Sequence, residues 1–377
     1  MSLHPAITTT PEIDQLLARN AVVAIGVSGG KDSDACAIAT SEYLDMIGHT
    51  GPRLLVHADL GSVEWVQSLS KCEALANTLG WELQVVSRKA GGMMDRWRVR
   101  WANNVSRYQD LSCVKLILPW STPTMRFCTS ELKSAPIASY LRRRFKGQDI
   151  VNVTGIRREE STNRRKAAVA ADDFRLKRKN AEGMVWNSII DMELADVKAT
   201  LARRGVPLHE AYTVYGSSRV SCTFCIMQSE VDMQASVRCE DNHANYRDMV
   251  DLEVRSTFAF QSKKWLGDVA PHLLGSELAD RLALAKEAAR VREIAELRIP
   301  ASLTYHKGWP VRRPTLDEAK LLVEVRTIVS DAVGLGARYL DPLSVIERYD
   351  ELLALKMEKA PAEAIRLPGD FQLSFSL

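Results

Sequence analysis

The six residues Ser28–Ser33, with the sequence Ser-Gly-Gly-Lys-Asp-Ser, are the part of the chain best suited to hold a phosphate group. Two glycines let the backbone turn tightly and bring its N–H groups close to an anion. The helix expected directly after them points its positive end at the same place. Lys31 and Ser33 add hydrogen-bond donors. The loop is not of the G-x-x-x-x-G-K-[ST] type, because Ile25 stands at the first glycine position.

The elements around this loop alternate between strand and helix. Helices are expected at 32–47 and 63–79, and apolar strand patterns occupy 21–28, 53–61, 82–87, 149–157 and 185–190. Strands that alternate with helices predict a doubly wound, mostly parallel α/β sheet covered on both faces.

The second half of the chain has a helical pattern. Apolar residues recur at helical spacing over 243–260, 275–297, 315–333 and 341–359. We therefore expect a nucleotide-binding α/β domain over 1–215 and a helical C-terminal domain over 261–377. The residues between them, 216–260, are expected to form a cysteine-containing loop and helix that complete the site.

The composition is that of an ordinary globular protein. The 377 residues are 46% apolar and 26% charged, and the formal net charge is only +3. No apolar run approaches the ~20 residues of a membrane-spanning helix, and no basic and apolar leader opens the chain. We therefore expect a cytoplasmic protein without a membrane partner. Seven cysteines without an export signal favour metal-binding or catalytic thiols over disulfides.

The loop in its strand–turn–helix setting resembles the pyrophosphate loop of the ATP pyrophosphatase superfamily. Further segments, in order over roughly residues 15–255, resemble motifs of its PAPS and APS reductase family. These are H-x-D-x-G at His57–Gly61, R-x-C-T-x-x-L-K at Arg126–Lys133, G-x-R-x-x-E-S at Gly155–Ser161 and S-R-x-x-C-x-x-C at Ser218–Cys225. The resemblance implies an enzyme that splits ATP between its α and β phosphates, attaches AMP to a substrate oxygen, and lets a nitrogen or sulfur nucleophile displace the AMP.

Two departures from the reductases bear on the reaction. The first loop is intact, whereas reductases usually carry a degraded one, and no cysteine follows Cys239 to match their C-terminal E-C-G-x-H segment. The chain is therefore more similar to the phage and DndC-like branch, whose members help put sulfur into DNA, and a sulfur donor protein is an implied partner. A PAPS or APS reductase and a nucleic-acid-binding subunit that uses ATP as a regulatory ligand remain as alternatives.

Ligands of a doubly wound sheet bind at the carboxyl ends of its strands, where Ser28, Asp59 and Gly155 are expected to converge. We expect Asp59 to meet the ribose or Mg²⁺, and Gly155 to let the adenine lie against backbone. Arg157 and Arg164 would neutralise phosphate charge. The expected catalytic residues are Lys31, Asp32 and Arg157, and those expected to bind ATP are Ser28, Gly29, Gly30, Lys31, Asp32, Ser33, Asp59, Gly155, Arg157 and Arg164. Asp32 would hold Mg²⁺ or cap the helix, and His57 would be a packed strand-end residue or a ligand.

The Cys222-x-x-Cys225 pair lies in a Ser-rich loop and is by itself compatible with zinc, iron–sulfur or redox use. No second C-x-x-C and no nearby H-x-x-x-H supports a zinc finger. Cys128 adds a third thiolate if the family fold holds, and a helix would return Cys239 as a fourth. We expect a [4Fe–4S] cluster held by Cys128, Cys222, Cys225 and Cys239; the alternative is a pair of small buried thiols in a tight turn.

Basic residues are concentrated in one segment. Residues 140–180 contain thirteen Lys and Arg, from Arg142 to Lys179, against five acidic residues, a net charge of +8. Such asymmetry is typical of a nucleic-acid-binding face. A second stretch, 95–108, interleaves arginines with Trp97, Trp101 and Tyr108, as stacked bases would require. The alternatives are a solvated helix face and arginines that serve ATP.

Overall fold

The computed structural model describes residues 7–364, which form two compact units. Unit 1 comprises the chain up to Asp95 together with Ser121–Tyr246, and unit 2 comprises Arg96–Trp120 together with the chain from Arg247 onward. This division differs from the three parts expected from the sequence, because the segment 96–120 packs with the C-terminal helices. Within the described residues, no helix combines the length and the apolar character needed to cross a bilayer.

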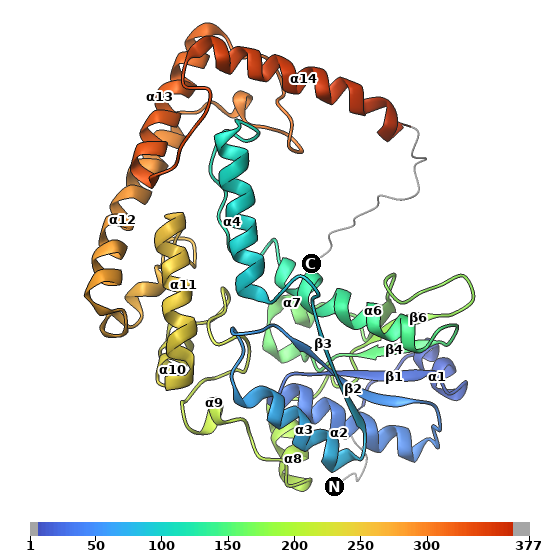
Figure 1. Cartoon of the computed structure of the whole chain (residues 1–377). Helices are drawn as coiled ribbons and strands as arrows, with labels where there is room; N and C mark the ends of the chain where they lie inside the picture. The colour runs from blue at the N-terminus through green and yellow to red at the C-terminus, as the bar shows by residue number, and fades with distance from the viewer. Residues whose placement is uncertain (1–6, 365–377) are drawn as a thin grey trace. The chain divides into compact units, whose positions relative to one another are not determined.

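Unit 1 is built on one six-stranded sheet with the strand order β3-β2-β1-β4-β6-β5 (Figure 1). All neighbouring strands are parallel except β5, which runs antiparallel to β6. The strands are β1 Val22–Val27, β2 Arg53–Asp59, β3 Glu82–Ser87, β4 Ile150–Val153, β5 Ala170–Asp172 and β6 Gly183–Trp186. The doubly wound, mostly parallel α/β class predicted from the sequence is confirmed.

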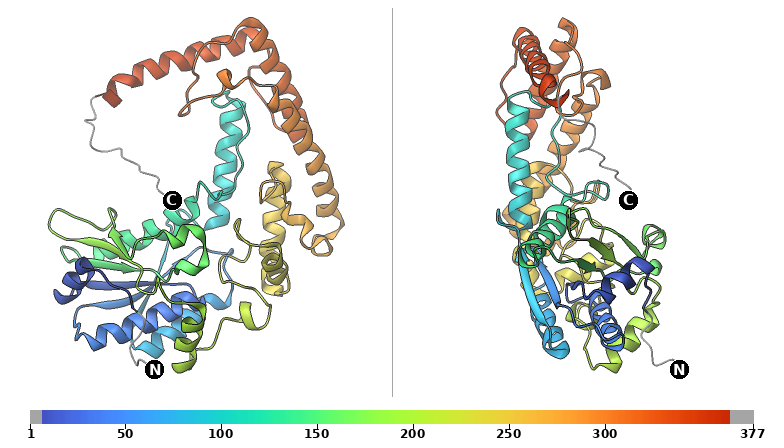
Figure 2. Two further views of the ribbon diagram at one scale, coloured as in Figure 1. Left: turned by 180° about the vertical axis from the view of Figure 1, so that it is seen from behind. Right: turned by 90° about the vertical axis from the view of Figure 1, so that its right-hand side faces the viewer.

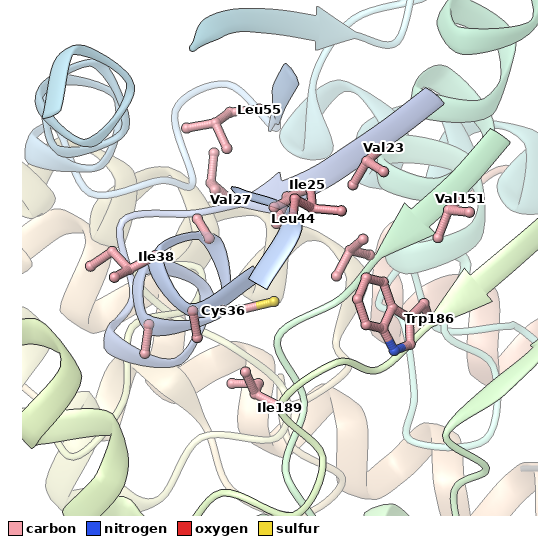
Figure 3. Packing of buried hydrophobic residues seen from close by; sticks show 14 of the residues in the cluster. Val23, Ile25, Val27, Cys36, Ile38, Leu44, Leu55, Val151, Trp186 and Ile189 are labelled. Carbon is pink, nitrogen blue, oxygen red and sulfur yellow. The ribbon is translucent and has the colours of Figure 1, made fainter. Parts of the chain in front are cut away.

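Helices cover both faces of this sheet (Figures 1 and 2). On one face, Val23, Ile25 and Val27 of β1 pack against α2 (Lys31–Met46), α3 (Gln67–Leu79) and α8 (Leu194–Arg203), as Figure 3 shows for part of this core. On the other face, Val22 and Ala24 pack with residues of α6 (Ala135–Arg144). Successive strand residues point to opposite faces, so a strand buried on both sides is apolar throughout.

The chain order places the ends of β1 and β4 side by side. The chain runs outward from β1 through β2 to β3 and then returns to β4, which pairs with β1 so that Ile25 lies opposite Val153. The direction of strand addition therefore reverses between β1 and β4. In open α/β sheets a ligand site forms at such a switch point, outside the carboxyl ends of the strands.

Short helices and loops complete unit 1. They are α1 Pro11–Ala18, α5 Phe127–Thr129, the π-helical turn Ser130–Ser134, α7 Thr162–Arg165, α9 Glu210–Thr213 and α10 Glu230–Val237. The loop between α9 and α10 carries Cys222 and Cys225, as the sequence predicts.

Unit 2 is helical, as its apolar spacing predicts. It contains most of α4 (Met93–Gln109) and of α11 (His243–Ser256), together with α12 Gly275–Leu297, α13 Leu316–Val333 and α14 Pro342–Ala364. The helices α12, α13 and α14 follow one another and pack in sequence order (Figure 2). Val325, Val329 and Tyr349 are among the buried residues of the core of this unit.

The aromatic residues of the 95–108 stretch belong to the core of unit 2 and do not form the stacking surface expected from the sequence. Trp97 is buried and packs edge-to-face against Trp120 at 5.2 Å between ring centroids. Tyr108 is fully buried, and Trp101 packs edge-to-face on Phe258. Their helical spacing places them on the buried stripe of an amphipathic helix, which explains the pattern without a ligand.

Candidate functional site

A polar pocket of about 290 Å³ lies at the switch point between β1 and β4. The loop after β1 and the loop after β4 form two of its walls, and the segment 212–220 forms the third. Its lining residues are Ser28, Gly30, Lys31, Asp32, Ser33, Gly155, Arg157, Glu160, Arg164, Tyr212, Ser218, Arg219 and Val220. Eight of the ten residues predicted to bind ATP are therefore brought together here, and Gly29 and Asp59 are not among the lining residues.

The loop Ser28–Ser33 is closed on itself by hydrogen bonds. The Ser28 N–H donates to Oγ of Ser33 at 3.3 Å, and that hydroxyl donates to the Gly30 carbonyl at 2.8 Å. Gly29 has a φ of +71°, a conformation that residues with a Cβ rarely adopt. Helix α2 begins at Lys31 with Gly30 as its N-cap residue, so the backbone N–H groups of its first turn lie beside the pocket.

Lys31 reaches across the pocket. Its ammonium group lies 3.3 Å from Oδ2 of Asp32, donates to the Ser218 carbonyl at 3.4 Å and lies 4.8 Å from the centre of the Tyr212 ring. The Tyr212 hydroxyl accepts hydrogen bonds from the N–H groups of Lys31 (3.3 Å) and Val220 (3.2 Å). Tyr212 therefore fixes the third wall of the pocket to the start of α2.

Arg157 is a buried cation at the back of the pocket, with 4% of its surface exposed. Its Nε donates to Oδ1 of Asp32 at 2.7 Å, and its Nη1 contacts Glu159. Burial opposes the charge of Arg157, but these carboxylates raise its pKa above the ordinary value. Arg157 is thus held charged and immobile, the state needed to stabilise negative charge that develops on a bound phosphate.

The structure corrects one expectation about Asp32, its role as helix cap, and shows what surrounds its carboxylate. Its side chain does not cap α2, because it lies in the first turn and Gly30 occupies the cap position. Both of its carboxylate oxygens are already paired, one with Arg157 and the other with Lys31. Asp32 therefore orients the two cations, and a magnesium ion would have to compete with both of them for its oxygens.

Arg219 is the lining cation that the prediction of site residues missed. Its side chain is exposed, and within residues 7–364 no ion pair is found for it, whereas Lys31, Arg157 and Arg164 are each paired with a carboxylate. The signal was present in the Ser-Arg of the late motif, but no periodicity placed that loop in the pocket. Tyr212 had no sequence signal, because it lies in a short helix far along the chain.

The anchor of the third wall is Asp232 of α10. It accepts hydrogen bonds from the Ser218 N–H at 2.6 Å and from the hydroxyls of Ser218 and Ser229 at 2.9 Å. Burial opposes the charge of Asp232, but these donors lower its pKa below the ordinary value. Asp232 is therefore a carboxylate at neutral pH, and it holds the loop that presents Arg219.

The structure gives Gly155 and Asp59 contacts that the sequence did not predict. A Cβ at Gly155 would lie 2.7 Å from the Asp32 carbonyl and 3.0 Å from Cβ of Cys36. Glycine is thus required for the close approach of the β4 loop to α2, while the same residue lines the pocket. Asp59 accepts a hydrogen bond from the Gly61 N–H at 2.7 Å and lines a separate hollow with Glu64.

Two buried histidines support the loop from behind. Nε2 of His57 lies 3.1 Å from Glu64, and its Nδ1 lies 3.1 Å from the Val27 carbonyl. Burial works against the charge of His57, but Cys72 and Glu64 raise its pKa to about 10, so it is a packed, charged strand-end residue. His209 accepts a hydrogen bond from the Ala211 N–H at 2.9 Å, and burial followed by the charge of Lys71 lowers its pKa to about 4.

The four predicted metal-binding thiols are not assembled into one site. Residues 7–364 contain no group of three or more His, Cys, Asp or Glu side chains placed to hold a metal ion. Cys239 is buried in a small core with Trp65 and Ala211. The thiol of Cys222 has a raised pKa, chiefly because of burial, with smaller contributions from Cys225 and Cys128. The four thiols are therefore not in a metal-holding arrangement within the described residues, although Cys225 and Cys128 are close enough to Cys222 to raise its pKa.

Cys222 and Cys225 nevertheless lie next to the pocket. Val220 lines the pocket, and Cys222 follows it by two residues, so their Cα atoms are at most about 7 Å apart. The Lys133 ammonium, in the π-helical turn Ser130–Ser134, acts to lower the pKa of Cys222 against the effect of burial. One short loop thus carries both the exposed Arg219 and a pair of thiols.

Comparison with known proteins gives weak structural likenesses. The chain is similar to a phosphoadenylyl-sulfate (PAPS) reductase from Candida auris, solved as a phosphate complex, at 16% identity and a TM-score of 0.35 over 58% of this chain and 97% of that one. It is also similar to the U34-tRNA thiolase NcsA from Methanococcus maripaludis, solved with its [4Fe-4S] cluster, at 12% identity and a TM-score of 0.33 over 69% and 83%. No family model and no curated protein matches the sequence. TM-scores this low carry no argument about the reaction.

Proposed function

We propose that the protein is an ATP pyrophosphatase-type enzyme that transfers AMP to an acceptor and supports sulfur transfer. The observation that carries this proposal is the pocket at the β1–β4 switch point, where four cationic side chains face the N-terminus of α2. Helix N-termini and arginines are the groups that bind phosphates in proteins. A volume of about 290 Å³ is close to the lower end of ordinary small-molecule pockets.

In the proposed reaction an acceptor oxygen attacks the α phosphorus of ATP. The bond between that phosphorus and the bridging oxygen of the β phosphate breaks, and pyrophosphate leaves with the electron pair. Lys31, Arg157 and Arg219 would stabilise the charge that builds on the departing group. Mg²⁺ would be held mainly by phosphate oxygens and water, as is usual for this ion, because Asp32 is already paired with two cations.

The second half of the proposed reaction uses a sulfur nucleophile that displaces AMP from the acceptor. The Cys222–Cys225 pair is the proposed carrier of this sulfur, because it follows the pocket wall within a few residues. A sulfur donor protein would load Cys222 as a persulfide, and the outer sulfur would attack the acceptor carbon while AMP leaves with the electron pair of the C–O bond. Attack of the Cys225 thiolate on the inner sulfur would then release the thiolated acceptor and leave a Cys222–Cys225 disulfide. A raised pKa keeps the Cys222 thiol protonated at neutral pH, so it must lose a proton before it can act. The [4Fe–4S] cluster stays a prediction, which iron and sulfide analysis of anaerobically purified protein tests.

Equilibrium binding of ATP with Mg²⁺, measured by calorimetry, tests the pocket. A side chain at Gly30 would lie 3.5 Å from Val220 and 3.6 Å from the Tyr212 hydroxyl, so Gly30→Val fills the mouth of the pocket and should abolish binding. Arg219→Ala should weaken binding at least tenfold, because a hydrogen bond to a charged group contributes about 1.5–3 kcal/mol. The matched control is Arg165→Ala, an exposed arginine that does not line the pocket.

The reaction itself is tested by release of pyrophosphate and of sulfite. Pyrophosphate release from ATP that is lost in Arg219→Ala and kept in Arg165→Ala supports the proposal. Unchanged ATP affinity in a folded Gly30→Val variant would refute it. Sulfite release from PAPS in the presence of thioredoxin would instead establish a reductase, and ATP binding without any turnover would establish a regulatory ligand.

A further inference from the structure

A second, larger hollow of about 560 Å³ lies beside α6, at the start of β4. Arg142, Arg143, Lys146 and Arg178 are its charged lining residues, and no Asp or Glu of the described chain lines it. Its apolar lining residues, Phe145, Ile150, Leu176 and Ala181, are buried. We call these lining residues the basic hollow. A cationic rim over an apolar floor fits a ligand that has both phosphates and a flat apolar part.

The basic hollow is separate from the proposed ATP pocket. Ile150, the first residue of β4, lines the hollow, whereas Gly155, beyond the last residue of that strand, lines the ATP pocket. The strand alone separates the two by about 10 Å, at 3.3 Å per residue. One small ligand therefore cannot occupy both, and the arginines of the hollow are not those that serve ATP.

The structure divides the thirteen cations of residues 140–180 into neutralised and available ones. Arg144 pairs with Glu82, and Lys177 pairs with Asp172 and Glu182. Arg158 and Arg164 are likewise paired, with Asp191 and Glu160. In the part of the chain that the structure describes, the charged residues that line the basic hollow are found in no ion pair. The Arg178 guanidinium donates to the carbonyl of Arg175 at 3.0 Å, which leaves its charge uncompensated.

An exposed aromatic residue lies on the segment that forms one wall of the hollow. Phe174 is 73% exposed, and the Arg175 guanidinium lies 4.5 Å from the centre of its ring. The segment is fixed by hydrogen bonds from the N–H groups of Leu176 (2.9 Å) and Lys177 (2.8 Å) to the Asp173 carbonyl. Stacked aromatic and arginine side chains on a fixed support are the usual platform for an unpaired base.

The cationic surface continues along α6. A neighbouring hollow of about 410 Å³ shares Ser139 and Arg143 with the basic hollow and adds Arg88 and Lys89 from the loop after β3, against one acidic lining residue, Glu131. A single phosphate would fill only a small part of this surface, whereas a chain of phosphates follows it. Duplex bases are paired and stacked and cannot enter an apolar hollow, whereas single-stranded bases can.

From these observations we infer that single-stranded nucleic acid binds along α6, with phosphates on Arg142, Arg143 and Arg178 and with bases in the hollow and on Phe174. This inference goes beyond the proposed ATP reaction and does not require it, because the two sites share no residue. If both hold, the strand is the macromolecule on which the adenylation or sulfur transfer takes place.

The test uses the full chain and fluorescein-labelled 20-nucleotide dT and U strands, with binding measured by fluorescence anisotropy at several salt concentrations. Two double variants are compared: Arg143→Ala with Arg178→Ala, and Arg144→Ala with Lys177→Ala. Each removes two positive charges from the same two segments, but only the second pair is already neutralised by carboxylates. The first should weaken binding at least tenfold and reduce the salt slope by about 1.4, at 0.7 per single-strand contact. The second should change both far less.

Phe174→Ala tests base stacking independently of charge. Loss of a stacked base should weaken binding between about fivefold and a hundredfold, without changing the salt slope, because no charge is removed. ATP affinity should remain unchanged in all three variants, which separates failure of this inference from failure of the proposed ATP site.

Several results would overturn the inference. Equal losses in the two double variants would show that general charge, and not this hollow, binds the strand. Competition by millimolar inorganic phosphate or by AMP as effective as competition by an unlabelled strand would show a simple anion or mononucleotide site. Tighter binding of a duplex of the same length, or loss of ATP affinity together with strand affinity, would also contradict it.

Discussion

At the scale of single residues, the candidate site depends on a few backbone and charge requirements. Gly29 supplies a left-handed turn, Arg157 a buried fixed cation and Arg219 an unpaired one. Asp32 holds two of the cations in place and does not stand alone as a metal ligand. Each requirement explains why one residue type, and not a similar one, occupies its position, and each leads to a measurable consequence.

Gly29→Ala should destabilise the protein more than Gly30→Ala. Gly29 has a φ of +71°, and a Cβ there would lie 3.1 Å from the Ser68 carbonyl and 3.3 Å from His209. The left-handed conformation alone costs about 1–2 kcal/mol for a residue with a Cβ. Gly30 has a φ of −85°, and a Cβ there makes only ordinary contacts. Urea unfolding of both variants measures the difference, and equal free energies of unfolding would contradict it.

His209 should make stability fall as the pH is lowered. Its pKa is about 4 in the folded protein and about 6.5 in an unfolded chain. Between these values the unfolded state binds more protons, so the free energy of unfolding decreases as the pH drops. From pH 7 to pH 5 this contribution amounts to about 2 kcal/mol. His209→Asn, which keeps an acceptor for the Ala211 N–H, should unfold with a smaller loss over that range. Equal losses in the wild type and the variant would exclude this role.

At the scale of elements, the pocket exists because two loops leave neighbouring parallel strands at the same edge. The β1 loop enters α2 directly, and the β4 loop passes so close to α2 that no side chain fits between them. The segment 212–220 is then tied to α2 through the Tyr212 hydroxyl and to α10 through Asp232. The site therefore depends on contacts among three elements, the β1 loop with α2, the β4 loop and the segment 212–220, and not on one motif alone.

Gly155→Ala tests the close contact between the β4 loop and α2. The added Cβ would approach the Asp32 carbonyl to 2.7 Å, and separation of the β4 loop from α2 should cost roughly 1–3 kcal/mol, as overpacking does. Because Arg157 follows on the same loop, ATP affinity should fall together with stability. Thermal unfolding and ATP calorimetry measure the two effects. Gly147→Ala, at a positive φ with open space around it, is a control for general backbone strain away from this contact.

At the scale of the whole molecule, the two units are not consecutive in the sequence. The segment 96–120 leaves unit 1 and joins the helices that follow residue 246. Trp97 and Trp120 pack with Phe260, and the buried Arg326 donates to the Tyr108 carbonyl at 2.9 Å. The core of unit 2 therefore requires chain from both sides of the segment Ser121–Tyr246.

Removal of residues 247–377 should leave an aggregation-prone protein. Without Phe260 and Arg326, Trp97 and Tyr108 lose their buried surroundings and become an exposed apolar patch. A chain in which a short Gly-Ser linker replaces residues 96–120 and which ends at Tyr246 should be soluble and bind ATP, because it retains the whole of unit 1. Gel filtration and binding of a hydrophobic dye compare the two proteins. Equal solubility would contradict the division into these units.

The sequence alone determined the α/β class, five of the six strands and the helices α2, α3 and α11 to α14, whereas α1, α4, α6, α8 and α10 were not predicted. Strand β3 and helix α12 lie at the predicted residues, and the four C-terminal helices occur where apolar spacing predicts them. Such patterns depend only on residues close together in the sequence, so they can be recognised without knowing the tertiary contacts. The short edge strand β5, Ala170–Asp172, was not predicted, because three residues paired on one side carry too little pattern.

The sequence also located the glycine-rich loop Ser28–Ser33 and most of the residues around the pocket. It could not place Tyr212 there, and it did not show that Gly155 is needed for a close backbone contact or that Asp59 lines a separate hollow, because these depend on which backbone segments approach each other. The same holds for the charges. The sequence shows thirteen Lys and Arg residues in the segment 140–180. Only the tertiary structure shows which of them form ion pairs with a carboxylate and which line the basic hollow. The spacing of apolar residues along the chain shows whether a segment forms a helix or a strand. Which distant side chains pair with one another is decided by how these elements pack in the fold.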